Sequence, residues 1–215
     1  EIFLSLSTTY RYDEAIPDLA SIAYVSDPEE WLVLLRTPSL WRILLPTNPD
    51  WTDAQIIDPE VMEARLQAVH PKQGRYEVVH RTAYRVHERV ADRYLDGRVF
   101  LAGDAAHINN PLGGMGMNGG IHDAVNLTEK LVEVWHGRAP LEGMGRYQRQ
   151  RRKVAVETVQ AQALRNRRIL TATDPDARRA HHEELRATVA DPAAHKAYVM
   201  RSSMIQSLRE LDAVA

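Results

Sequence analysis

Hydrophobic positions in the first part of the chain fall in short runs that are separated by polar turns. Four runs have a strand-like composition, at residues 2–10, 21–25, 31–36 and 41–45. Asp27-Pro28 and Thr37-Pro38-Ser39 separate the last three runs with residues typical of turns. A spacing of about ten residues predicts an antiparallel meander. Because Trp31–Leu35 is almost continuously apolar, we expect this strand to be central and covered on both faces.

Further along the chain, strand patterns give way to helical ones. Asp58-Pro59-Glu60 predicts the start of a helix, because Asp caps the backbone and Pro suits the first turn. Residues 76–79 and 83–86 predict two more strands, and residues 91–97 a short connector. Apolar positions at helical spacing then predict three helices, over residues 146–171, 177–189 and 193–211. Strands first and helices last indicate an α+β fold.

Special-purpose residues gather in the middle of the chain, between Arg98 and Leu131. The apolar run Val99–Ala102 predicts a strand, and Gly103-Asp104 predicts a turn that carries a carboxylate. A glycine-rich loop is expected from Pro111 to Gly120. A helix should follow, with Ile121, Val125 and Leu131 on one side and Gly137 as its C-terminal cap.

The glycines match G-x-G-x-x-G over Gly114–Gly119, but their context does not fit a dinucleotide fold. The predicted strand ends about a dozen residues earlier, and no strand with an acidic end follows the helix. Glycines before a helix can instead expose backbone N–H groups to an electron-rich ligand edge. Asp104 suits hydrogen bonds to polyol hydroxyls. The alternative is a tight strand-to-helix connection that binds nothing.

Composition removes several classes of function. The chain has 215 residues, a net charge of −2 and no cysteine, so disulfides and thiolate metal sites are excluded. The charge gives no reason to expect nucleic acid or an anionic membrane as partner. No apolar run approaches the roughly 18 residues of a membrane span. His181-His182 is interpreted as part of a solvated helix face rather than a metal site. We expect a cytoplasmic protein without a metal.

The residues of the central stretch carry a specific resemblance. The shared positions are Gly103-Asp104-Ala105-Ala106-His107, Pro111, Gly113-Gly114, Gly116, Asn118, Asp123-Ala124, Asn126-Leu127 and Lys130-Leu131. In this pattern the stretch closely resembles the second flavin-binding motif of group A FAD-dependent monooxygenases, the para-hydroxybenzoate hydroxylase-like family. A looser likeness extends upstream through Tyr84–Tyr94 and downstream to Tyr147 and Arg151-Arg152. Residues 1–170 together look like the second half of such an enzyme.

The resemblance implies a division of the chain into three regions. Residues 1–92 would form an antiparallel sheet that covers the substrate, with Trp41, Arg42 and Leu44 as possible contributors. Residues 93–137 would supply a strand, loop and helix that complete an FAD-binding domain. Residues 138–215 would form a C-terminal helical region.

The resemblance also implies roles for single residues. Asp104, on the turn at Gly103, would bind the ribityl hydroxyls of FAD. Gly113, Gly114 and the backbone amides onward through Met115, Gly116, Met117 and Asn118 would face the pyrimidine edge of the flavin. Pro111 would lie near the reacting face of the ring, which makes it the candidate catalytic residue. From its place beside Asp104, His107 is interpreted as ordering the turn or contacting the cofactor backbone rather than transferring a proton.

The activity implied is hydroxylation of an aromatic or similarly electron-rich small molecule. NADPH or NADH would reduce the flavin, and oxygen would be captured as a flavin hydroperoxide. The family's first motif, a strand followed by G-x-G-x-x-G, is absent from the sequence, and so is its Asp-Gly motif. We therefore expect a missing N-terminal half of the same enzyme as partner, and no activity from this chain alone. The alternatives are a related halogenase or reductase, or a non-catalytic remnant of the fold.

Overall fold

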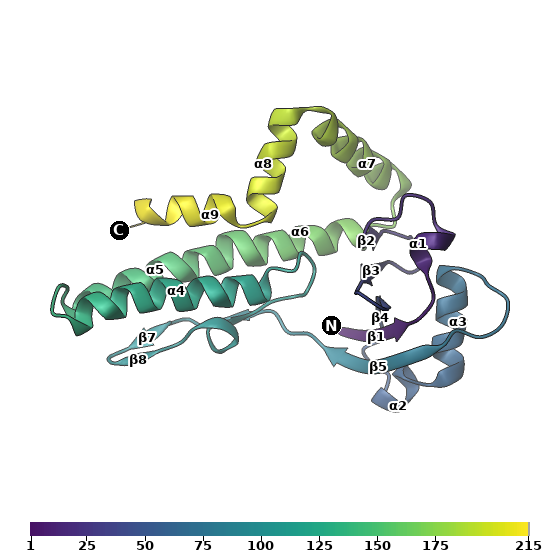
Figure 1. Ribbon diagram of the computed structural model, residues 1–215, viewed down its shortest axis with the longest axis horizontal. Helices are drawn as coiled ribbons and strands as arrows, with labels where there is room; N and C mark the ends of the chain where they lie inside the picture. The colour runs from purple at the N-terminus through teal and green to yellow at the C-terminus, as the bar shows by residue number, and fades with distance from the viewer. Residues whose placement is uncertain (215) are drawn as a thin grey trace. The chain divides into compact units, whose positions relative to one another are not determined.

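The structure, a computed structural model, describes residues 1–214 and divides the chain into two compact units (Figure 1). The first unit contains Glu1–Val86 and Ile169–Asp174, and the second contains His87–Arg168 and the chain from Pro175 onward. The fold is mixed α+β, as the sequence predicted, with an antiparallel sheet early and long helices late. The three functional regions expected from the sequence remain a prediction.

The first unit is built on a five-stranded antiparallel sheet with the order β2-β3-β4-β1-β5. Its strands are β1 (Ile2–Thr8), β2 (Ile22–Val25), β3 (Leu32–Arg36), β4 (Trp41–Pro46) and β5 (Val78–Arg85). The predicted meander is confirmed for β2, β3 and β4, whereas β1 lies between β4 and β5. The two strands expected at residues 76–79 and 83–86 are wrong. They form one strand, because β1 pairs with β5 continuously from Ile2–Arg85 to Ser7–His80.

One face of the sheet carries the core of this unit. Leu4, Leu6, Ile43 and Leu45 pack there with Met62 and Leu66 of α3 (Pro59–Val69). The predicted start of this helix is confirmed, because the Asp58 side chain accepts hydrogen bonds from the N–H groups of Glu60 and Val61. Sequence analysis missed α1 (Tyr12–Ala15) and α2 (Asp53–Ile56), which are only four residues long. In β3, three successive residues are buried, Leu32, Val33 and Leu34, so both faces of this strand are covered as expected.

The opposite face of the sheet is more polar. In an antiparallel pair, directly opposed residues share a face. Ser7 of β1 is opposed by Arg42 and His80, Ser5 by Leu44 and Thr82, and Phe3 by Tyr84. Arg42, His80, Thr82 and Tyr84 are exposed. Trp41 lies on the core face instead, where its Nε1 donates a hydrogen bond to Asp13.

The second unit begins with two small pairs of strands. β6 (Arg89–Val90) pairs with β9 (His107–Ile108), and β7 (Leu95–Asp96) pairs with β8 (Val99–Phe100). The connector predicted at residues 91–97 is wrong, because it contains β7. The strand expected over Val99–Ala102 is reduced to β8. A tight turn at Gly97, with φ of +55°, folds β7 back on β8 as a hairpin.

Long helices form the rest of the second unit. α4 (Gly116–Trp135) lies beside α5 (Gly145–Val154), to which η2 (Leu141–Met144) connects it (Figure 1). The predicted helix over residues 146–171 is confirmed, although it contains a π-helical segment, η3 (Ala155–Gln160), before α6 (Ala161–Leu170). α7 (Pro175–Ala190) follows as predicted. The prediction of one continuous last helix is wrong. Two helices, α8 (Pro192–Ser202) and α9 (Ile205–Glu210), are separated at Met204, where φ is +62°. η4 (Leu211–Ala213) follows α9.

Within residues 1–214, no helix combines the length and the apolar character that crossing a membrane requires.

Candidate functional site

The predicted Gly103-Asp104 turn is a single 3-10 turn, η1 (Gly103–Ala105), which Leu101 and Ala102 separate from the end of β8. Gly103 has a φ of +58°, a conformation that L-residues rarely adopt. The turn presses against the start of α4: a Cβ added at Gly120 would lie 3.3 Å from the Cα of Gly103. Asp104 is exposed. The backbone therefore presents a carboxylate to solvent on a turn that only glycine can form easily.

A buried carboxylate, that of Asp123 in α4, forms a hydrogen bond with the backbone of the turn. Asp123 is fully buried. Its Oδ2 accepts a hydrogen bond from the backbone N–H of Gly103 at 3.0 Å and another from Nε2 of His107 at 2.7 Å. Its Oδ1 accepts from Nε of Arg151 at 2.5 Å. One side chain thus connects the turn, strand β9, helix α4 and helix α5.

Opposite charge keeps this buried carboxylate ionised. Burial by itself raises the pKa of Asp123, but hydrogen bonds from His107 and Arg151 outweigh it and leave the pKa below its usual value. Because the ionised Asp123 can only accept, His107 must carry its proton on Nε2. Arg151, almost fully buried, also donates from Nη2 to the carbonyl oxygen of Gly119 at 3.2 Å.

Aromatic rings enclose the same cluster. The ring of Tyr94 stacks on that of His107, with centroids 6.2 Å apart, and Tyr147 lies against Tyr94. The hydroxyl of Tyr147 donates to the carbonyl oxygen of Leu101 at 2.6 Å, two residues before the turn. Burial raises the pKa of Tyr147, so its hydroxyl keeps its proton and remains a donor. His107 shares the Asp123 carboxylate with the N–H of Gly103, which fits a role in ordering the turn.

The predicted glycine-rich loop is shorter than expected, because α4 already begins at Gly116. Gly113 and Gly114 have φ values of +110° and +65°, which turn the chain into the helix. Met115 is buried as the N-cap residue, whereas Met117 and Asn118 are exposed in the first turn. Pro111 is half-buried at the start of the loop. The structure therefore places the predicted site residues at the N-terminus of a twenty-residue helix.

A residue from the long helix also supports this loop. Nδ2 of Asn166 in α6 donates to the carbonyl oxygen of Leu112 at 3.4 Å, and Gln162 holds the Asn166 side chain through Oδ1 at 2.8 Å. A Cβ added at Gly113 would come within 3.2 Å of that same Nδ2. Sequence reasoning missed Asn166, because a single polar residue on a helix carries no signal of a distant contact.

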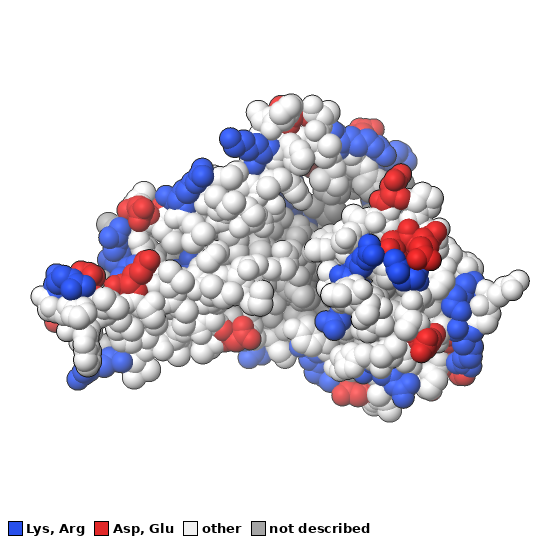
Figure 2. Space-filling view, viewed as in Figure 1, with Lys and Arg blue, Asp and Glu red and all other residues white. Residues whose placement is uncertain are grey.

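The apolar face predicted for α4 does exist but is not buried. Ile121 and Val125 are 52% and 51% exposed, and Trp135 is 86% exposed, whereas the buried positions are Gly119 and Asp123. In the space-filling view, the surface over the middle of α4 is almost free of charged residues (Figure 2). Within residues 1–214, this apolar side of the helix is therefore exposed to solvent. The predicted end of the helix is confirmed, since His136 is the C-cap and Gly137 follows with φ of +68°.

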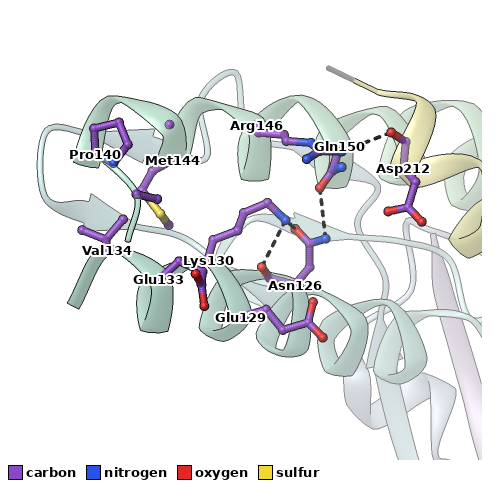
Figure 3. A pocket seen from close by; sticks show the side chains of 12 residues that line it. Asn126, Glu129, Lys130, Glu133, Val134, Pro140, Met144, Arg146, Gln150 and Asp212 are labelled. Atoms are coloured by element: carbon purple, nitrogen blue, oxygen red, sulfur yellow. Dashed lines mark hydrogen bonds between the residues drawn. The ribbon is translucent and has the colours of Figure 1, made fainter. Parts of the chain in front are cut away.

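A cavity of about 370 Å³ lies at the other end of α4 (Figure 3). Three of its polar side chains form a hydrogen-bonded chain: Lys130 donates to Asn126, Asn126 donates to Gln150, and Gln150 donates to the carbonyl oxygen of Leu211. The pKa of Lys130 is lowered, and the largest cause is its burial. Because these groups already satisfy one another, the cavity is interpreted as part of the scaffold.

Comparison with known proteins identifies the family. A family model described as FAD binding domain matches residues 34–162, which is more than half of the chain and includes the turn, the glycine loop and α4. The chain belongs to this FAD-binding domain family. Its predicted resemblance to group A FAD-dependent monooxygenases is thereby confirmed.

The relatives found by sequence are monooxygenases by name. The chain is 31% identical over 173 residues to para-nitrophenol 4-monooxygenase of Pseudomonas sp. strain WBC-3, covering 79% of this chain and 43% of that protein. It is 42% identical over 105 residues to 6-hydroxy-3-succinoylpyridine 3-monooxygenase of Pseudomonas putida strain S16, covering 49% of this chain and 27% of that protein.

Solved structures agree with this assignment. The structure of p-nitrophenol 4-monooxygenase from Pseudomonas putida DLL-E4 matches with a TM-score of 0.82 and 29% identity, over 93% of this chain and 52% of that one. Aklavinone-11 hydroxylase, solved with FAD and aklavinone, matches with a TM-score of 0.68 and 27% identity, over 78% of this chain and 32% of that one. The chain thus spans about half the length, or less, of the relatives that it matches.

Proposed function

We propose that the protein to which this chain belongs is an FAD-dependent monooxygenase that uses NADH or NADPH to hydroxylate an aromatic small molecule. The observation that carries the proposal is the exposed carboxylate of Asp104 on the Gly103 turn, beside the N-terminus of α4. Family membership, and relatives that act on aromatic compounds, support it.

The residues present fit FAD. A helix N-terminus offers backbone N–H groups that have no partner within the helix, together with a partial positive charge. Glycine at position 116 lets the Asn109 side chain pack closely against this end, since a Cβ there would lie 3.0 Å from Oδ1 of Asn109. An electron-rich ring edge suits these donors, and the Asp104 carboxylate suits hydroxyl groups. The fit is therefore to a cofactor that has both features.

Each site residue has a definite task in this proposal. Asp104 accepts hydrogen bonds from the ribityl hydroxyls. Backbone N–H groups between Gly113 and Asn118 donate to the pyrimidine edge, where the helix dipole favours negative charge; that of Gly114 instead donates to the carbonyl oxygen of Pro111 at 2.9 Å. Pro111 lies beside the reacting face. When bound, FAD supplies the redox chemistry, taking electrons from NAD(P)H and activating oxygen.

The polar face of the sheet in the first unit is proposed as the substrate-covering surface. Arg42, Thr82 and Tyr84 are exposed there, while Leu44 adds apolar surface. Such a mixture suits an aromatic ring with polar substituents. A comparison of Arg42→Ala with Arg81→Ala, which lies on the core side of β5, tests the assignment. Only the first is expected to raise KM for the substrate.

We further propose that the remaining part of the FAD site comes from a segment of the same protein before Glu1. The exposed apolar face of α4 supports this idea, as does the coverage of only 43% and 52% of two relatives. A cavity of about 440 Å³ continues this face, with Phe100, Leu131 and Trp135 in its lining. On this view the isolated chain is inactive, and the complete protein works in the cytoplasm.

The test is to express the complete open reading frame and to examine it for bound yellow flavin and substrate-stimulated oxidation of NAD(P)H. Product analysis under oxygen, with and without halide, distinguishes hydroxylation from halogenation, and oxidation of NAD(P)H without oxygenated product would indicate a reductase. Purified complete protein that never takes up FAD would contradict the proposal and favour a non-catalytic remnant.

A further inference from the structure

The orientation of Asp104 is set by its backbone alone. Its side chain is exposed, and within residues 1–214 no hydrogen bond or ion pair fixes it. The turn that carries it has one glycine at a φ of +58° and a backbone N–H that donates to Asp123. The group that accepts from this N–H therefore helps to fix the backbone that presents the Asp104 carboxylate.

We propose that Asp123 is a positioning residue for the flavin site, whose buried carboxylate fixes the Gly103 turn and so aims Asp104 at the ribityl chain. The inference rests on the FAD binding proposed above. Asp123 contacts no part of the proposed cofactor position directly, because it is fully buried beneath the turn. It acts through Gly103.

The two oxygens of Asp123 have separate partners, which explains why a carboxylate is needed. Oδ1 accepts from Arg151, and Oδ2 accepts from both Gly103 and His107. All three partners are donors. Asparagine has only one oxygen, so in either orientation its NH₂ group would face a donor and leave it without an acceptor. If the asparagine oxygen turned toward Arg151, the backbone N–H of Gly103 would lose its acceptor.

Stability alone gives a weak reason for this cluster. A buried ion pair costs desolvation energy, and apolar residues of similar size are often as stable or more stable. The cluster does, however, connect elements that must keep a fixed register. It holds Gly103 of the turn to Asp123 of α4, and Arg151 of α5 to the carbonyl of Gly119 in the glycine segment. The relative position of the Gly103 turn and the start of α4 matters if both contact one cofactor.

The experiment compares the complete protein with its Asp123→Asn variant. FAD affinity is measured by fluorescence titration of the apoprotein, and exchange of the Gly103 amide by NMR. Loss of a hydrogen bond to a charged group predicts a Kd for FAD that rises about tenfold or more. The Gly103 amide should exchange about tenfold faster, while amides in the middle of α4 keep their rates.

A matched control separates positioning from general loss of stability. Met144 is buried at the far end of α4, so Met144→Ala should lower stability without touching the turn. We expect this variant to bind FAD as the wild type does. Equal weakening of FAD binding in both variants would overturn the inference.

A second variant keeps the test decisive if Asp123→Asn fails to fold. Asp123→Leu combined with Arg151→Met removes both buried charges, a change that often preserves stability. A stable double variant with weakened FAD binding and a fast Gly103 amide supports positioning. A stable double variant that binds FAD normally refutes it. If the wild-type protein itself takes up no FAD, the proposed function fails, whereas the Gly103 amide still reports on the turn.

Discussion

Helices α3 and α4 meet their surroundings in opposite ways. α3 buries its apolar residues Met62 and Leu66 in the core of the sheet, as an amphipathic helix of a globular protein normally does. α4 buries Gly119 and Asp123 and exposes Ile121, Val125 and Trp135. α3 therefore completes a core, whereas the inner face of α4 holds a polar network and its outer face is exposed within residues 1–214.

A hydrophobic pattern at helical spacing can therefore serve two purposes. In α3 the pattern records packing within the unit. In α4 the apolar face lies opposite the side that holds the Gly103 turn and is exposed, which is the observation behind the proposed covering segment. Variants of the two helices should separate these purposes.

The largest effect is expected from breaking the buried pair beneath the turn. Arg151→Met would leave the Asp123 carboxylate buried without its cation, which costs about 3–5 kcal/mol in comparable pairs. Lys153→Met on the same helix is the matched control, because its exposed ion pair with Glu157 contributes only about 0.5 kcal/mol. Denaturant unfolding measures both. Similar losses in the two variants would show that the buried pair is not special.

The sequence predicted the first unit better than the site, for physical reasons. Strands β1 to β4 were found because alternation and turn residues are local signals. The start of α4 at Gly116 was missed, since glycine is a poor helix former and tertiary contacts override that preference. The break at Met204 was missed as well, because no glycine marks its positive φ.

For the buried half of the candidate site, the family pattern in the sequence includes Asp123 and Arg151 but assigns them no role. Asp104 and the glycines stand close together in the sequence and carry a recognisable pattern. The supporting network joins Gly103, His107, Asp123 and Arg151, which are up to 48 residues apart, 151 minus 103. A single Asp within a helix is usually read as part of a solvated face. Its role becomes visible only when the fold brings its partners together.

A conventional cavity is the next effect in size. Leu66→Ala in α3 removes a fully buried side chain and should lower the unfolding free energy by about 2–5 kcal/mol. Ala68→Gln, at an exposed position of the same helix, should change it by at most about 0.5 kcal/mol. FAD affinity of the complete protein should stay unchanged in both, provided that the variants are folded. Reduced affinity in folded Leu66→Ala would mean that the two helices are not functionally distinct.

Acid should weaken the network beneath the turn but not the apolar core of α3. The native pKa of Asp123 lies below its unfolded value, so its ionised form stabilises the fold above the ordinary aspartate pKa of about 4. This stabilisation is lost as the pH falls through the lowered native pKa. Unfolding free energies measured between about pH 2 and 6 should fall more steeply for the wild type than for Asp123→Leu with Arg151→Met. Parallel curves would show that Asp123 does not contribute to the pH dependence.

The smallest effect is expected on the outer face of α4, and here its size should depend on how much of the protein is present. In the 215-residue chain, Ile121→Gln or Val125→Gln should change the unfolding free energy by at most about 0.5 kcal/mol, because both side chains are already half exposed. In the complete protein, a covered side chain should cost about 1.5–3 kcal/mol when it is replaced. Val189→Gln on α7, also exposed, is the control and should behave alike in both proteins. If the α4 variants change the unfolding free energy of the complete protein equally little, this face stays exposed there too. The apolar residues on the surface of α4 would then have a cause other than a covering segment.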